Sequence, residues 1–275
     1  MIKIGSYNEL EVIKKTNIGI YLGTQAESVF LPQRKVPANT QIGDKLTVFV
    51  YTDSQDRPIA TTERPKAAAG EFACLRVMDV TPFGVFMDWG LDKDLLVPFK
   101  HQHQRMEKGR KYVVRLCLDE KTNRVIGVSK LNQFLSDKPV DIKEGQKVSL
   151  LVYGFMEVGM MVIVDHKYAG LLYRNEVFEK LFIGDEREGY VKKIREDGKI
   201  DVSLQKQGHL AIDDSKTAVL AALEKSSGFL PYHDKSDPED IKHIFKMSKK
   251  AFKKAIGGLY KDKKIKISEE GIHGL

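Results

Sequence analysis

The chain has 275 residues and a formal net charge of +7 at pH 7. Apolar residues make up 42% and charged residues 30% of it, which excludes a chain that is disordered throughout and indicates a soluble globular protein. The isoelectric point near 9.1 favours a polyanionic partner, although many soluble proteins are equally basic. No apolar run approaches the roughly 18 residues that cross a bilayer, so we expect no membrane partner.

The first residues and the cysteines bear on the cellular compartment. Residues 1–10 lack the apolar core of a signal peptide, so we expect a cytoplasmic protein. Cys74 and Cys117 are the only cysteines, and both fall in apolar strand patterns. Two cysteines make neither a disulfide framework nor a zinc site. We expect small core residues in a reducing compartment, with no metal and no cofactor.

One motif occurs three times along the chain. Each copy has a glycine among apolar residues, then a short apolar segment, then a second glycine. The two glycines are 24, 25 and 25 positions apart in the three copies, at Gly19 and Gly43, Gly84 and Gly109, and Gly159 and Gly184. Such regular spacing indicates one small structural unit used three times.

The middle copy gives the clearest prediction of secondary structure. Apolar and alternating segments predict five short strands, at residues 72–77, 84–88, 94–98, 112–118 and 124–129. The turn at 121–123 predicts that the last two strands form a hairpin. Five short strands in about 60 residues favour a small closed or nearly closed barrel.

Turn-rich stretches separate the units. Residues 64–66 and the alanines after them separate the first two copies, and residues 136–139 separate the second from the third. Beyond 207–208 the apolar period changes from two to a helical spacing. We predict domains at 1–64, 67–135, 140–208 and 213–275.

The last segment is a different module. Residues 217–225 suit a helix, and Asp237 followed by Pro238 and two acids is a strong helix start. Ser248 suits the start of a third helix, which Gly257-Gly258 should loosen or end. Residues 265–267 read as a strand before a turn. The apolar stripe of the first helix is Val219, Leu220 and Leu223, and one face of the second carries Ile241, Ile244 and Phe245. The expected buried side of the third helix is Phe252, Ala255, Ile256 and Leu259. Three helices and a terminal hairpin resemble a winged helix.

The repeats resemble the RNA-binding domain named after ribosomal protein S1, a five-stranded OB-fold barrel. The resemblance is strongest at residues 83–86, which read Phe-Gly-Val-Phe. It implies a face that binds single-stranded RNA through two aromatic residues, a histidine, an acid and a base. By this match the RNA-binding residues are Phe83, Phe86, Asp119 and Arg124, while the histidine position falls on Pro98.

The chemistry of these residues suits single-stranded RNA. Exposed aromatic rings stack on bases at about 1–3 kcal/mol each. Arg124 can pair with phosphate or stack on a base, and Asp119 can orient Arg124 or accept from a base or a 2′-hydroxyl. Core packing is the alternative for Phe83 and Phe86, because a spacing of three places them awkwardly on one face of a strand.

The other copies depart further from the domain pattern. The first aligns Tyr21, Asp53 and Arg57 with an aromatic residue, the acid and the base. The third aligns Tyr173 with the histidine and Lys199 with the base, and it has no clear acid. The third barrel either contacts RNA through these residues or is mainly structural.

The last module carries the densest positive charge, with ten lysines and one acid from residue 242 to 266. Lys249, Lys250, Lys253 and Lys254 lie opposite the apolar stripe of the third helix. This face is either a phosphate-binding surface or a solvated one. Without Arg, Asn or Gln between 248 and 260, it is not suited to reading bases in a major groove.

Three such repeats before a winged helix resemble the conserved virulence factor B family of bacterial regulators. The resemblance implies RNA binding and post-transcriptional control of virulence-factor expression. We therefore expect a mostly β, multidomain protein with three tandem OB-fold barrels and an α+β winged helix, acting as a non-catalytic binder of single-stranded RNA. The alternatives are a regulator that binds duplex DNA through the winged helix, and a nuclease. The nuclease has less support, because no metal-ligand spacing or phosphate-cradling loop occurs.

Overall fold

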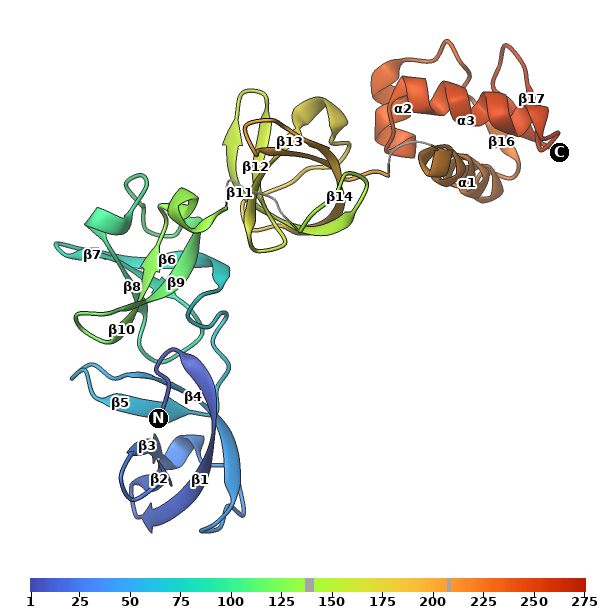
Figure 1. The fold of residues 1–275 in the computed structure, drawn as a ribbon. Coiled ribbons are helices and arrows are strands. Elements are labelled where there is room, and N and C mark those ends of the chain that lie inside the picture. Colours follow the sequence, from blue (N-terminus) through green and yellow to red (C-terminus); the bar gives the residue numbers. More distant parts are fainter. Residues whose placement is uncertain (137–140, 207–208) are drawn as a thin grey trace. The chain divides into compact units, whose positions relative to one another are not determined.

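The computed structural model describes residues 1–136, 141–206 and 209–275 (Figure 1). It divides into two compact units, Met1–Leu135 and Ser136–Leu275, which are described separately. The first unit contains two closed five-stranded barrels, and the second contains a third barrel and a helical domain with a three-stranded sheet. The predicted fold class is confirmed. The predicted boundaries near 137–140 and 207–208 lie outside the described residues.

The first barrel has the strand order β1-β2-β3-β5-β4. Its strands are β1 (Ser6–Thr16), β2 (Gly19–Gly23), β3 (Ser28–Pro32), β4 (Lys45–Thr52) and β5 (Pro58–Thr61). Neighbours pair antiparallel except β3 and β5, which pair in parallel and close the barrel. A short 3-10 helix, η1 (Gln33–Lys35), follows β3.

The second barrel repeats this plan. Its strands are β6 (Phe72–Thr81), β7 (Gly84–Asp88), β8 (Leu95–Pro98), β9 (Lys111–Asp119) and β10 (Arg124–Val128). All five predicted strands are present, and the predicted hairpin pairs Arg124 with Asp119. The 3-10 helices η2 (Phe99–His101) and η3 (Leu131–Phe134) follow β8 and β10.

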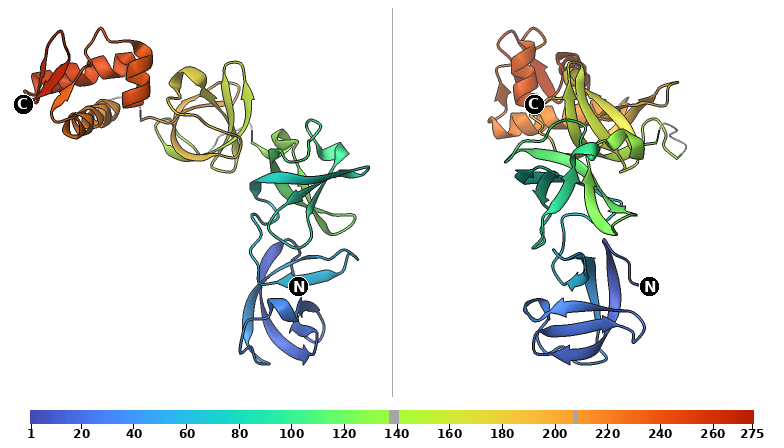
Figure 2. Two further views of the ribbon diagram at one scale, coloured as in Figure 1. Left: turned by 180° about the vertical axis from the view of Figure 1, so that it is seen from behind. Right: turned by 90° about the vertical axis from the view of Figure 1, so that its left-hand side faces the viewer.

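The third barrel, seen from two further sides in Figure 2, has the same order of strands. Its elements are β11 (Lys147–Met156), β12 (Gly159–Val164), β13 (Tyr168–Tyr173), η4 (Arg174–Glu176), β14 (Glu186–Ile194) and β15 (Ile200–Ser203). The threefold sequence repeat is therefore a threefold structural repeat.

The first glycine of each copy lets two strands approach closely. A β-carbon on Gly84 would lie 2.3 Å from the carbonyl oxygen of Val97 on β8, and the φ of Gly84 is +153°. The same contact would be 2.3 Å at Gly19 and 2.2 Å at Gly159. Any side chain here would separate the second and third strands of the barrel, so glycine is required.

The second glycine holds a bulge in the first strand. Gly109 has a φ of +83°, and its amide donates a hydrogen bond of 2.8 Å to the carbonyl oxygen of Val77, where the pairing of β6 with β7 shifts before Asp79. Gly43 and Gly184 make the same hydrogen bond at 2.9 and 2.8 Å, to Val12 and Val152. A bulge bends a strand, and this bend lets a single long strand contribute to both sides of a small barrel.

The two barrels of the first unit share an apolar core. Phe49 and Tyr51 of β4 pack against Trp89, the only tryptophan of the chain, with ring centroids 5.8 and 6.1 Å apart. Lys93 Nζ donates to the carbonyl oxygen of Asp53 at 2.6 Å. The apolar core and the Lys93–Asp53 hydrogen bond both join the first barrel to the second. These two barrels therefore form one folding unit.

The helical domain comprises α1 (His209–Lys225), β16 (Phe229–Leu230), α2 (Pro238–Phe245), α3 (Lys249–Lys261), β17 (Ile265–Ile267) and β18 (Ile272–Gly274). Both predicted helix starts are confirmed. The Asp237 carboxylate accepts from the amide of Glu239 at 2.7 Å, and the Ser248 hydroxyl accepts from the amide of Ala251 at 3.2 Å. Each cap satisfies an amide that has no partner within its helix.

Two helices of this domain differ in detail from the sequence patterns. Of the two effects considered for Gly257-Gly258, ending the helix does not occur, since α3 continues to Lys261. A β-carbon on Gly258 would lie 2.3 Å from Lys216 Cε, so the flexible end of this α1 side chain would have to shift. Ile244 is 45% exposed, because the buried stripe of α2 is narrow and consists of Ile241 and Phe245.

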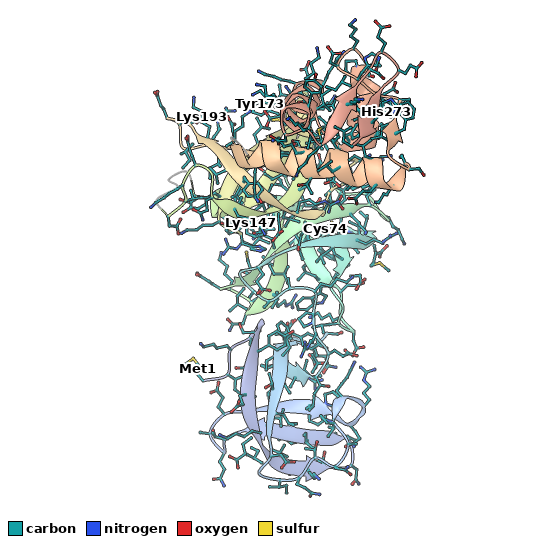
Figure 3. The ribbon with its side chains drawn as sticks, turned by 90° about the vertical axis from the view of Figure 1, so that its right-hand side faces the viewer. Met1, Cys74, Lys147, Tyr173, Lys193 and His273 are labelled. Carbon is teal, nitrogen blue, oxygen red and sulfur yellow. The ribbon has the colours of Figure 1, made fainter. Side chains whose placement is uncertain are left out.

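The two cysteines are half-buried, not fully buried as expected, and burial raises the pKa of the Cys117 thiol. Cys74 is labelled in Figure 3, on β6. In the described part of the chain, no helix has the length and apolar character needed to cross a membrane.

The shared core makes a prediction about stability. Trp89→Ala should lower the free energy of unfolding by about 3–5 kcal/mol, because a large buried ring is lost at the boundary. Hydrogen exchange should accelerate in both barrels of the first unit, and circular dichroism should show the lower unfolding midpoint. Phe83→Ala, which removes an exposed ring, serves as the control and should change stability by less than about 0.5 kcal/mol. Faster exchange in the second barrel alone would contradict a common folding unit.

Candidate nucleic-acid interface

The aromatic residues of the second barrel lie at the start of β7. Phe83 stands in the turn between β6 and β7 and is 77% exposed, so the core alternative does not apply to it. Phe86 lies within β7, is half-buried, and pairs in register with Leu96 of β8. The turn at Gly84 places Phe83 before the strand and Phe86 on it. Their spacing of three therefore does not require both rings to lie on one face of a regular strand. The arrangement offers one open ring for stacking and one partly enclosed ring.

Asp119 and Arg124 are opposite each other in the β9–β10 hairpin, but their side chains form no ion pair. The Asp119 carboxylate accepts from the Thr122 hydroxyl at 2.8 Å. Arg124 instead donates through Nη2 to the carboxylate of Asp56, in the β4–β5 turn of the first barrel. Of the two roles considered for Asp119, the structure does not show the orientation of Arg124, and contact with a base or a 2′-hydroxyl stays a prediction. Asp56 was missed because its contact joins residues 68 positions apart.

The histidine position of the domain pattern is Pro98, and η2 follows it directly. Phe99 is partly exposed, and the charge of Lys100 acts on Asp119. The Thr122 hydroxyl lowers the pKa of Asp119 most, and the charge of Lys100, together with that of His101 when it is protonated, adds to the effect. Burial, followed by the charge of Lys100, lowers the pKa of His101, which favours the neutral imidazole, a form that can both donate and accept. Thus η2 places His101 near Asp119, although the histidine position of the domain pattern itself is Pro98.

In the first barrel the structure joins two of the three predicted residues, Asp53 and Arg57, while Tyr21 contacts a different residue. Tyr21 is half-buried, and its ring centroid lies 5.3 Å from that of Phe30 on β3. Arg57 donates to one carboxylate oxygen of Asp53 through Nε at 2.9 Å and through Nη2 at 2.7 Å. Here the acid does orient the base.

The third barrel carries a polar network that sequence reasoning missed. Arg195 donates to the hydroxyl of Tyr173 and, at 2.6 Å, to the carboxylate of Asp201. Tyr173, labelled in Figure 3, also lies under the ammonium of Lys192, 5.7 Å from its ring centroid. Lys199 is exposed and pairs with Asp197 at 3.1 Å. An aspartate inside a short apolar strand was the available signal for Asp201, which is only 8% exposed.

The helix α3 has the two faces that its sequence predicts. Phe252, Ala255, Ile256 and Leu259 are buried. Lys250, Lys253 and Lys254 are exposed, and Lys249 is half-buried. Lys253 lies 3.8 Å from Asp234, a distance that leaves its ammonium accessible to other anions.

The described side chains contain no group of three or more histidine, cysteine, aspartate or glutamate residues that could hold a metal ion.

Three barrels of this type before a winged helix define a multidomain protein built from nucleic-acid-binding domains. Residues 4–63 match the S1 domain model, and residues 217–273 match that of the CvfB-like winged helix domain. The chain is 30% identical over 275 residues to conserved virulence factor B of Staphylococcus epidermidis, which spans 96% of this chain and 92% of that protein. It belongs to the conserved virulence factor B family.

Two other relatives align over nearly the whole chain. The uncharacterized protein YitL of Bacillus subtilis is 30% identical over 274 residues, which cover 95% of this chain and 90% of that protein. A crystal structure of a multidomain protein with nucleic acid binding domains from Streptococcus pneumoniae covers 99% of this chain and 98% of its own, at 26% identity and a TM-score of 0.46.

The lysine face of α3 makes a prediction about salt dependence. Replacing Lys250, Lys253 and Lys254 by glutamine should weaken nucleic-acid binding. It should also reduce the slope of log affinity against log salt by up to about 2, since each phosphate contact on a single strand contributes about 0.7. Fluorescence anisotropy at several salt concentrations measures both quantities.

A charge-matched control replaces three exposed lysines of the first unit, Lys3, Lys45 and Lys111, by glutamine. This control has the same net charge as the α3 variant, but all the lysines of α3 are unchanged. Equal changes of slope in the two variants would show that net charge acts alone, and would contradict a phosphate contact at α3.

Proposed function

We propose that this protein is a non-catalytic, cytoplasmic binder of single-stranded RNA that regulates gene expression after transcription. The observation that carries the proposal is the exposed ring of Phe83 at the start of β7, with the half-buried ring of Phe86 on β7 and Arg124 and Asp119 on the β9–β10 hairpin of the same barrel. An exposed phenylalanine costs apolar hydration, and stacking against a base offsets that cost.

Stacking favours single strands over duplexes. The faces of the bases are covered in a duplex but open in a single strand, where aromatic rings can reach them. The 2′-hydroxyl offers Asp119 a donor that DNA lacks, so the acid favours RNA. Burial lowers the pKa of His101 and so favours its neutral form, which can donate or accept near this acid.

The other modules extend the same strand-binding surface in the proposal. Tyr21, Asp53 and Arg57 supply a weaker copy of the site on the first barrel. Tyr173 and Lys199 supply a ring and a charge on the third. The lysines of α3 hold phosphates without reading bases. Several weak contacts on one chain raise the overall affinity through effective concentration.

Membership in the conserved virulence factor B family supports a regulatory role. A protein that binds RNA by stacking and charge, without a catalytic step, acts by occupying the strand and changing its access to other factors. We infer the same mode of action here, and we expect the length of bound RNA to stay unchanged during incubation with Mg²⁺.

The proposed face can be tested directly. Phe83→Ala combined with Phe86→Ala should weaken binding to a short oligouridylate by at least about tenfold, because two stacking rings are lost. Fluorescence anisotropy gives the affinity, and circular dichroism establishes that the double variant is folded.

Phe182→Ala is the matched control for this experiment, since Phe182 is also an exposed phenylalanine, outside the assigned faces. Its affinity for the oligouridylate should equal that of the unaltered protein. A folded double variant with unchanged affinity would reject the face.

The lysine surface of α3 favours one alternative, a duplex-DNA-binding regulator. Competition at matched salt separates the two functions. We expect unlabelled single-stranded RNA to displace a labelled oligouridylate at lower concentration than duplex DNA does. The reverse order would favour the winged helix as the principal site and DNA as its ligand.

A further inference from the structure

A cavity of about 320 Å³ lies between the two barrels of the first unit. Its lining comes from the first barrel through Tyr51 and Asp56, and from the second through Phe86, Lys93, Asp94 and Arg124. This volume is at the lower end of the range for sites that bind small molecules, about 300–1,000 Å³. Phe86 and Arg124 belong also to the proposed RNA face, so the cavity is continuous with that face.

Two polar residues of opposite charge, Arg124 and Asp94, line this cavity. The Nε atom of Arg124 is buried without a hydrogen-bond partner among the described residues, while the side chain as a whole is 40% exposed. Asp94 is half-buried, and its side chain forms neither a hydrogen bond nor an ion pair with any described residue. Burial and then the charge of Asp88 raise the pKa of Asp94, against the charge of Lys66, which lowers it. A ligand that accepts from the exposed N–H groups of Arg124 and donates to the Asp94 carboxylate would engage both residues.

The rest of the lining favours a flat, uncharged ligand. The ring of Phe86 and the side chains of Leu96 and Ile126 form an apolar wall. Two cations, Lys93 and Arg124, are balanced by two acids, Asp56 and Asp94. Balanced charge gives a phosphate group no advantage, whereas a neutral heteroaromatic ring with polar edges can meet the apolar wall and both types of polar group.

We propose that this cavity binds one guanine base of the RNA strand. The proposal rests on the proposed function and adds a base preference to it. Guanine presents N1–H and the N2 amino group side by side, and a carboxylate such as Asp94 can accept from both. Its O6 and N7 atoms accept from arginine, the commonest partner of guanine. Arg124 is already fixed by Asp56 through Nη2, so the exposed N–H groups of its guanidinium are oriented before a base binds.

The other bases satisfy this pair of groups less well. Uracil has one ring N–H between two acceptors, and adenine and cytosine each have one amino group beside a ring acceptor. With any of these three bases, one oxygen of the Asp94 carboxylate would lie opposite another acceptor or have no hydrogen-bond donor. A specific pair of hydrogen bonds discriminates between bases by about tenfold or more.

The first experiment compares short oligouridylates that carry one central guanosine, inosine, adenosine, cytidine or uridine. We expect guanosine to bind about tenfold more tightly than uridine, and inosine, which lacks the N2 amino group, to fall between them. Asp94→Asn should reduce the guanosine preference to less than about twofold and leave the all-uridine affinity unchanged. Glu107→Gln, an exposed acid outside the cavity, removes the same charge and should change neither value.

The second experiment blocks the cavity without touching its polar groups. Ser54 is an exposed residue of the β4–β5 turn that lines the cavity, and its neighbour Gln55 is exposed but does not line it. Ser54→Trp should abolish the guanosine preference, and Gln55→Trp should preserve it. Because both substitutions are on an exposed turn, both proteins should fold, which circular dichroism checks.

The outcomes separate this inference from the proposed function. If no oligonucleotide binds, both fail. If oligouridylate binds and depends on Phe83, but the five central nucleotides bind equally, the base pocket alone is rejected. A preference for cytidine or adenosine that Asp94→Asn removes would overturn guanine as the ligand. The affinity for guanosine monophosphate is measured as well, because a free nucleotide carries the same base as the strand. Tighter binding of the free nucleotide than of the guanosine-containing strand would overturn RNA as the source of the base.

Discussion

The close approach of the second and third strands at the first glycine of each repeat is the constraint on which the barrels depend. At Gly84 the neighbouring carbonyl of Val97 leaves no room for a β-carbon, and β7 begins there. Phe83 immediately precedes this contact and therefore lies in the turn, where its ring is exposed. The bulge held by Gly109 provides the other half of barrel closure. The residues that close the barrel thus also determine which aromatic ring faces solvent.

The two barrels of the first unit are more than adjacent copies. Trp89 inserts into a core that the first barrel shares, and Asp56 of the first barrel binds Arg124 of the second. An arginine that is held by a carboxylate loses less side-chain entropy when it binds a ligand than a free one does. The first barrel, whose own aromatic positions are weaker, therefore contributes to the proposed site mainly by fixing a residue of its neighbour.

Local signals were sufficient to predict most of the secondary structure but not the partners of the site residues. The strands of the second barrel and the starts of α2 and α3 follow from short-range patterns and capping residues. The pairing of Arg124 with Asp56 and the network of Arg195 join residues that only the fold brings together. The low helix propensity of Gly257-Gly258 is likewise a local property, and α3 continues through it because its buried residues on both sides, Ile256 and Leu259, pack in the core of the domain.

The second unit divides stacking and charge differently from the first. The third barrel has Val158 and Met161 at the aromatic positions, and it neutralises Arg195 internally through Asp201. On α3, Lys250, Lys253 and Lys254 are exposed, and Lys253 has an ion-pair partner at 3.8 Å, Asp234. Counterion release requires cations that are not already paired, so we expect the electrostatic part of binding in this unit to come from α3 and not from the barrel. Such charge adds affinity for any strand, and the discrimination between strands then rests on the rings and polar groups of the first unit.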